Sequence, residues 1–258
     1  MRVNSDTGEA GSFLDIEFSR MEMAATIDWI LTAMAGDRFR YVVTPNVDHV
    51  VKLHSGEAGH PAFNDAVHSA DLRINDSRIL RRLASLSGID LPVVPGSDLT
   101  GRLITNGLPA DSTVVLIGGS SGDLKWLRAN LAGTKITQHQ PPMAVLRDPA
   151  IQRRIVEFVE TERPNLTLFA FGAPQSEIVA HQIQQRAAAP GVGLCIGASV
   201  EFLTGAKRRA PKAMQRLGLE WAFRLLSEPK RMWRRYLVEG PKIFAIWQKW
   251  TVRQRMRR

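Results

Sequence analysis

The sequence predicts an α/β fold in which a mostly parallel sheet carries helices on both faces, followed by a basic amphipathic helical C-terminal appendage. Short β-branched runs recur along residues 13–210, and segments with helical spacing separate most of them. This alternation is typical of a Rossmann-like sheet. The charge distribution predicts the appendage. Residues 201–258 contain 16 Lys and Arg against 4 Asp and Glu and so carry +12, whereas the whole chain carries +9, which leaves −3 on the other 200 residues.

Length and composition narrow the class of protein. The chain has 258 residues, of which 44% are hydrophobic and 23% are charged, as in soluble globular proteins. The single cysteine, Cys195, lies in an apolar run and is predicted to be buried in a protein of a reducing compartment. No segment has the pattern of a signal peptide or a transmembrane helix. We therefore expect a cytoplasmic protein with a mobile leader (1–12), one α/β domain (13–210) and the appendage (211–258).

The first half of the chain alternates between the two periodicities. Strands are expected at 13–18, 39–43 and 71–75, with an extended segment at 91–94. Helices are expected at 19–35, 47–53, 61–69, 77–86 and 99–106. Ser19 and Glu22 have the spacing of a capping box, which predicts that Ser19 begins the first helix.

The second half repeats this order more plainly. Strands are expected at 113–117, 135–138, 166–171 and 192–196. Helices are expected after Gly122 as far as Leu131, at 148–160 and at 174–188, with a loop at 140–147. Ligands of such sheets bind at the carboxyl ends of the strands. The chemistry is therefore expected in five turns: Thr44–Asn46, Asn75–Arg78, Gly118–Gly122, Gly172–Glu177 and Gly197–Ser199.

Three of these turns allow a functional and a structural interpretation. The glycines at 118 and 119 precede a helix, where backbone N–H groups bind phosphate, but glycines also serve simply to turn a chain. Asn75-Asp76-Ser77 contains a candidate general base, and it is also the usual composition of a helix cap. The segment Gly172–Glu177 places Pro174 at a helix start, which capping alone explains.

Several kinds of chemistry find no support in the sequence. The six histidines show no metal-ligand spacing, and no GxSxG motif indicates a serine hydrolase. No Asp-x-Asp pair is present to hold a divalent ion on a diphosphate. We therefore expect no metal and no cofactor, and we expect arginines and helix N-termini to balance the charge of any departing nucleotide.

The appendage combines cations with aromatic residues. Met214, Leu217, Trp221 and Leu225 form one apolar helical stripe, a second helix starts at Pro229, and Gly240-Pro241 is expected to interrupt it. Aromatic residues among Lys and Arg suit the interface of an anionic membrane, where each basic residue contributes roughly 1 kcal/mol. The alternative is that these helices pack on their own domain and expose a charged side to solvent.

A set of motifs in fixed order identifies a resemblance. The motifs are TPN (44–46), the acid at 76, PGSDL (95–99), LIGG (116–119), FGAP-x-x-E (171–177), the RAP block ending at Pro211, LGLEW-x-x-RL (217–225) and EP-x-R (228–231). From Phe13 to about Trp250, the chain resembles the WecG/TagA/CpsF glycosyltransferases (glycosyltransferase family 26). The RAP and LEW-x-x-RL blocks are the most specific parts of the match.

The resemblance implies an inverting, metal-independent transferase. Such an enzyme moves a sugar from a UDP-sugar (N-acetylmannosamine, its uronic acid or glucose) to a sugar on undecaprenyl diphosphate at the inner face of the plasma membrane. It also implies that Asp76 is the general base and that Arg224 and Arg231 bind a diphosphate. Substrate contacts are expected from Thr44, Asn46, Arg78, Gly118, Gly119, Gln175, Ser176, Glu177, Glu201, Arg224 and Arg231.

Three positions differ from the family pattern. The usual Asp-Gly is Asp76-Ser77, the arginine usual before PGSDL is Val93, and the usual Pro-Lys-Gln-Glu is Pro174-Gln-Ser-Glu177. Arg78 is a hypothetical replacement for the charge missing at Val93. These differences leave the donor sugar, the acceptor and the glycan open, and the sequence does not decide whether the chain forms a homo-oligomer.

Two other functions compete with this interpretation. The basic tail also suits a nucleic-acid-binding module, but the sequence has no recognisable reading motif and we expect no nucleic acid. A Rossmann-type dehydrogenase would carry a glycine fingerprint after an early strand, and none is present.

Overall fold

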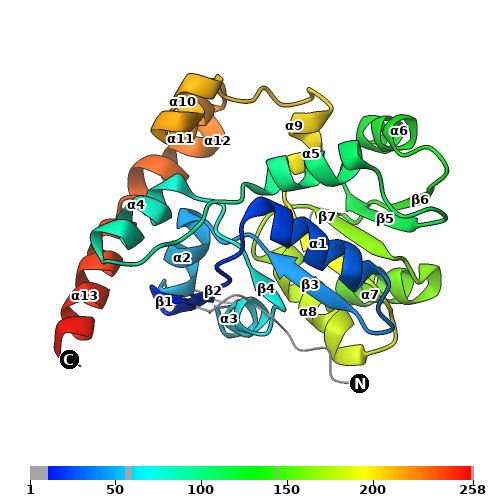
Figure 1. Cartoon of the computed structure of the whole chain (residues 1–258), viewed down its shortest axis with the longest axis horizontal. Helices are drawn as coiled ribbons and strands as arrows, with labels where there is room; N and C mark the ends of the chain where they lie inside the picture. The colour runs from blue at the N-terminus through cyan, green and yellow to red at the C-terminus, as the bar shows by residue number, and fades with distance from the viewer. Residues whose placement is uncertain (1–10, 56–59, 143–144, 257–258) are drawn as a thin grey trace.

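A computed structural model describes residues 11–55, 60–142 and 145–256 of the chain. Its centre is a parallel six-stranded sheet with the strand order β4-β3-β8-β7-β5-β6 (Figure 1). The strands are β3 (Arg40–Val43), β4 (Leu72–Arg73), β5 (Thr113–Gly118), β6 (Lys135–His139), β7 (Leu166–Ala170) and β8 (Val192–Cys195). All neighbours in the sheet pair in parallel, which confirms the predicted fold class.

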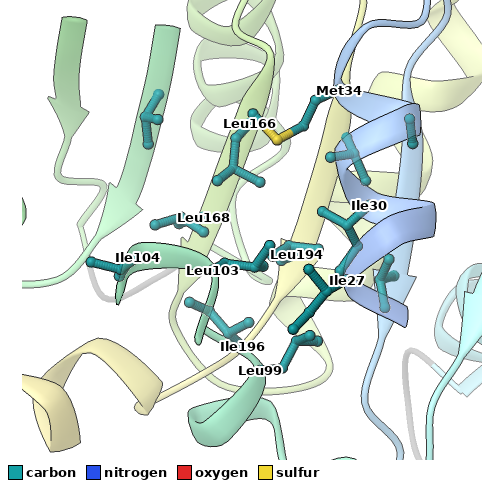
Figure 2. Packing of buried hydrophobic residues seen from close by; sticks show 14 of the residues in the cluster. Ile27, Ile30, Met34, Leu99, Leu103, Ile104, Leu166, Leu168, Leu194 and Ile196 are labelled. Atoms are coloured by element: carbon teal, nitrogen blue, oxygen red, sulfur yellow. The ribbon is translucent and has the colours of Figure 1, made fainter. Parts of the chain in front are cut away.

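Helices cover both faces of this sheet. One face packs against α1 (Met23–Met34) and α5 (Gly96–Asn106), and Figure 2 shows Ile27, Ile30 and Leu103 beside Leu168 and Leu194 of the strands. The opposite face packs against α7 (Pro149–Glu162) and α8 (Gln175–Arg186). Alternate residues of a strand point to opposite faces, so the four central strands β3, β8, β7 and β5 contribute to both apolar clusters.

Gly193 in the middle of β8 shows how closely this core is packed. A side-chain carbon at this position would lie 2.6 Å from Cζ of Phe39 and 2.8 Å from Cε2 of Phe169. Only glycine therefore fits between the two rings. Gly193 lies inside a strand and not in a turn, so packing explains why a glycine interrupts this apolar run.

A third apolar cluster joins the two ends of the chain. It contains Phe13 and Phe18 of the hairpin β1 (Gly11–Phe13) and β2 (Ile16–Phe18), residues of α2 (Val47–Leu53) and α3 (His60–His68), and Ile243 and Trp250 of α13 (Lys242–Met256). The rings of Phe13 and Trp250 meet edge to face at 5.3 Å. One side of α13 is therefore part of the core. On that side the helix packs on its own domain, as the alternative to a membrane interface predicted.

The remaining helices include α4 (Arg78–Leu86), which Figure 1 shows on the other side of the molecule from α6 (Ser121–Asn130) and α9 (Ser199–Leu203). The others are α6 beside β6, α9 after β8, and in the appendage α10 (Lys212–Leu217), α11 (Glu220–Ser227), α12 (Pro229–Trp233) and the π-helical segment η1 (Arg234–Glu239). Of these, α10, α11 and α12 stand nearest α4 (Figure 1). No helix in the described ranges is long and apolar enough to cross a membrane.

Three local predictions are wrong. Residues 13–18 are not one strand, because Leu14 and Asp15 adopt positive φ values of 53° and 62° and turn the chain into a hairpin. Ser19 is not a helix cap: its N–H and Oγ pair with the backbone of Arg73, and α1 begins after Glu22 without a side-chain cap. The apolar stripe 214–225 does not lie on one helix, because Gly218 (φ 71°) ends α10.

Other boundaries shift or fall outside the described residues. The segment 91–94 is extended but joins no sheet, and its Val94 N–H donates to Asn75 O at 2.9 Å. Of the predicted leader, only Gly11 and Ser12 are described, and they form the start of β1. Residues 143–144 of the predicted loop also lie outside the described ranges.

Candidate active site

A cavity of about 410 Å³ opens at the carboxyl ends of β3 and β4. The turns after these two strands form one wall, and the appendage forms the other. Four predicted site residues line it: Asn46, Asp76, Arg78 and Arg224. The appendage contributes Glu220 and Trp221 of α11, Arg235 and Tyr236 of η1, and Phe244 of α13. Segments more than 100 positions apart in the sequence therefore meet around Asp76.

The three side chains of the turn Asn75–Ser77 make different hydrogen bonds. Ser77 Oγ accepts the Leu80 N–H at 3.3 Å and so caps α4. Asn75 is buried, accepts the Ser77 N–H at 2.9 Å and donates to Pro92 O at 3.1 Å. Asp76 is left free of capping, and its Oδ1 accepts the Gly96 N–H at 2.8 Å. The capping alternative for this turn is therefore confirmed on Ser77, and the role of Asp76 as general base stays a prediction.

The surroundings of Asp76 make it a stronger base than an ordinary carboxylate. Burial raises the pKa of Asp76 to about 6, although the Gly96 N–H and the Arg224 guanidinium oppose the rise. Nearby Glu220 adds to it. Its Oδ2 has no hydrogen-bond partner among the described residues. A carboxylate held by one oxygen, ionised at neutral pH and facing a cavity can take a proton from a bound hydroxyl group.

Behind Asn46 lies a buried chain of polar residues. Asn46 caps α2 by accepting the Asp48 N–H at 3.0 Å, and its Oδ1 lies 3.2 Å from Nδ1 of His49. Nε2 of His49 lies 3.2 Å from Oε1 of Glu177, the acid of the FGAP-x-x-E motif. Glu177 therefore supports the cavity wall from behind and does not line the wall itself. His49 was missed from the sequence, although its position three residues after the N-cap asparagine was the available signal.

Other predicted residues also lie behind or away from the cavity. Thr44 is buried and donates to Cys195 O at 3.1 Å, and Ser176 Oγ donates to Phe171 O. Gln175 begins α8 and is not part of the described cavity lining. Glu201 is paired with Lys207, with Oε2 and Nζ 2.5 Å apart. A substrate contact by these residues stays a prediction.

The Gly118-Gly119 turn lies at the end of β5 and outside the described cavity lining. Both glycines have positive φ values, of 82° and 67°, so the tight-turn interpretation is confirmed. The Ser120 N–H already donates to Asp123 Oδ2 at 2.7 Å. That carboxylate competes for the helix N-terminus with any phosphate, whose binding here stays a prediction.

The arginines of the appendage have different surroundings. Arg224 lines the cavity, and its guanidinium lies 4.5 Å from the centre of the Phe202 ring. Arg231 is 56% exposed, pairs with Glu228 at 2.7 Å and is absent from the described cavity wall. Arg235, one helical turn further on, lines the cavity in its place. The sequence showed the run of cations, but the helical phase after Pro229 decides which one faces inward.

Arg235 also links the appendage to the sheet domain. It lies 3.4 Å from Asp48 Oδ2, which Lys52 contacts at 2.8 Å. Burial on its own would raise the pKa of Asp48, but Arg235 and Lys52 outweigh it and hold that pKa below its usual range. Within the described ranges no three His, Cys, Asp or Glu side chains converge on a possible metal position.

The cavity at the strand ends of this parallel α/β sheet joins a carboxylate of raised pKa, Asp76, to the cations Arg224 and Arg235, an arrangement that can bind an anionic substrate and accept a proton from it. The sequence matches the Glycosyl transferase WecG/TagA/CpsF family over residues 11–257, and the chain belongs to that family. It is therefore a glycosyltransferase, and the family implies a nucleotide-sugar donor and an acceptor substrate.

Proposed function

We propose that this glycosyltransferase is inverting and metal-independent. It moves a hexose or N-acetylhexosamine residue (N-acetylmannosamine, its uronic acid or glucose) from a UDP-sugar to an acceptor on undecaprenyl diphosphate. It acts at the inner face of the bacterial plasma membrane, in the assembly of an exopolysaccharide, capsule or related envelope glycan. The observation that carries the proposal is Asp76, a carboxylate of raised pKa that shares a cavity with Arg224 and Arg235.

The residues around the cavity suggest one displacement step. Asp76 takes the proton of the acceptor hydroxyl, and the oxygen attacks the anomeric carbon as the bond from that carbon to UDP breaks. A single displacement inverts the anomeric configuration. The guanidinium groups of Arg224 and Arg235 balance the negative charge that develops on the departing diphosphate. Family membership favours this chemistry over the nucleic-acid and dehydrogenase interpretations.

Exposed apolar side chains of the appendage support a position on the membrane surface. Leu226 is 79% exposed, and Leu217, Trp233, Leu237 and Phe244 are also exposed. They lie among the cations that give residues 201–258 their positive charge. Apolar side chains among cations suit an anionic bilayer interface, where the former are immersed and the latter lie over the headgroups.

The test is the transfer of a radiolabelled sugar from UDP-sugars to a lipid diphosphate acceptor. Replacing Asp76 by Asn should lower kcat by about 10²–10⁴-fold, because the amide cannot take the proton. The wild-type rate should fall as the pH drops through about 6, the pKa of Asp76. Asp90→Asn, a change in an exposed carboxylate outside the described cavity lining, is the matched control. If Asp76→Asn keeps more than a tenth of the wild-type rate, Asp76 is not the base.

A further inference from the structure

A second groove, of about 470 Å³, adjoins the cavity that holds Asp76. It is lined by Arg78, Arg81, Arg82, Ser85 and Leu86 of α4 and by Arg216 of α10. Arg78 lines both hollows, so the two are neighbours across one side chain. None of the lining residues is acidic.

The geometry of α4 places its arginines on one side. Arg78, Arg81, Arg82 and Ser85 follow the spacing i, i+3, i+4 and i+7, which puts them on one helical face. The opposite face, with Leu80 and Leu83, is buried and fixes the rotation of the helix. The guanidinium groups therefore gather because the apolar face is anchored in the core.

These arginines form no ion pair within the described ranges, unlike Arg38, Arg186, Arg209 and Arg253. Arg82 has one hydrogen bond, from Nη2 to the Leu217 carbonyl oxygen at 3.0 Å. Like charges held together without a counter-charge repel one another, and a bound anion relieves that repulsion. Planar guanidinium groups match the oxygen atoms of phosphates especially well.

The turn between α10 and α11 lies against the arginines of α4. A side-chain carbon at Gly218 would lie 3.7 Å from Cβ of Arg78 and 3.7 Å from Nη1 of Arg82. Two apolar side chains stand at the same place: Leu86, 74% exposed, lines the groove, and Leu217, 57% exposed, provides the carbonyl for Arg82. The groove therefore combines guanidinium groups, which suit phosphate, with an exposed leucine at one side.

We propose that this arginine groove binds the diphosphate of the lipid-linked acceptor, with the lipid chain leaving past Leu86 and Leu217. The acceptor sugar then reaches Asp76 past Arg78. Arg224 and Arg235 on the opposite wall remain for the diphosphate of the donor. This assignment rests on the proposed function and gives each diphosphate its own set of arginines.

The experiment measures binding and catalysis separately. Arg81→Ala removes an exposed cation for which the structure shows no hydrogen bond. Arg153→Ala, an exposed arginine of α7 outside both described hollows, is the matched control. The dissociation constants of geranyl diphosphate, geranyl monophosphate and UDP are measured for each variant, and thermal unfolding verifies folding. KM values for a UDP-sugar and for the lipid diphosphate acceptor are measured in parallel.

We expect Arg81→Ala to weaken geranyl diphosphate binding about tenfold, as the loss of one charge-assisted hydrogen bond does. Its affinity for UDP should stay unchanged, and Arg81→Lys should recover part of the loss. The KM for the lipid acceptor should rise and that for the donor should not. Arg153→Ala should change none of these values.

Other results overturn the proposal. An unchanged dissociation constant for geranyl diphosphate, or an equal loss for UDP, removes the acceptor assignment. If Arg81→Ala weakens only the binding to phosphatidylglycerol vesicles, the groove binds a phospholipid headgroup. A protein that transfers no sugar but binds geranyl diphosphate through Arg81 contradicts the proposed function and leaves the groove in place. If Arg81→Ala has full transfer activity and an unchanged KM for the acceptor, the proposed function stands and the acceptor assignment of the groove is overturned.

Discussion

At the scale of single residues, the proposed general base Asp76 carries a cost in stability. Its carboxyl is withdrawn from water and compensated mainly by the Gly96 N–H and by Arg224. A pKa of about 6 in the folded chain exceeds the ordinary value of an aspartate, so the folded state holds this proton more tightly than the unfolded chain does. Ionisation of Asp76 therefore costs folding free energy. The cost is absent below about pH 4, grows between pH 4 and 6 and is complete above.

Asp76→Asn should therefore stabilise the protein at neutral pH while it removes activity. At pH 7.5 we expect the free energy of unfolding to rise by roughly 1–3 kcal/mol, because the amide carries no charge to desolvate and its oxygen still accepts the Gly96 N–H. At pH 4 the difference between variant and wild type should disappear. Urea unfolding at the two pH values measures both quantities. A variant less stable than wild type at pH 7.5 would contradict this account of Asp76.

At the scale of elements, α13 belongs to the core as much as to the appendage. Trp250 is 4% exposed and meets Phe13, and Arg253 lies 2.9 Å from Asp15 in the turn of the same hairpin. The last helix thus fastens η1, and with it Arg235, against the sheet domain. Truncation after Ala210 would remove this packing together with the exposed apolar and cationic residues of the appendage. Point substitutions separate the two effects.

Trp250→Ala should destabilise the protein by about 3–5 kcal/mol, the usual effect of deleting a buried aromatic side chain. Phe244→Ala, on the same helix but 57% exposed, should change stability by less than about 0.5 kcal/mol. Denaturant midpoints of the two variants make the comparison. Equal effects would show that α13 does not pack on the hairpin in solution.

At the scale of the whole molecule, charge and exposed apolar surface lie together. The exposed apolar side chains of α10–α13 belong to the same segment of the chain as the cations of 201–256, whereas residues 1–200 carry a small negative charge. Binding to an anionic bilayer then depends on both terms, and added salt weakens only the electrostatic one.

Leu226→Glu should weaken binding to phosphatidylglycerol vesicles about tenfold or more, because it removes immersed apolar area and adds a repelled charge. Leu146→Glu places the same charge at an exposed leucine outside the appendage and should have little effect. Sedimentation with vesicles at low and high salt gives both affinities. Equal affinity of wild type and Leu226→Glu would show that α11 does not meet the membrane.

The sequence by itself determined the parallel α/β architecture, the turns that hold the site, and the family, because these depend on local periodicity and on motifs at fixed spacing. The tertiary structure decided which side chains share the cavity. Asp76, Arg224 and Arg235 line one cavity, Arg231 lies outside its described lining, and Glu177 contacts His49 behind Asn46. The sequence also did not predict the tight turn at Leu14-Asp15 or the burial of Trp250. Both depend on packing between the two ends of the chain, and that packing leaves no local pattern in the sequence.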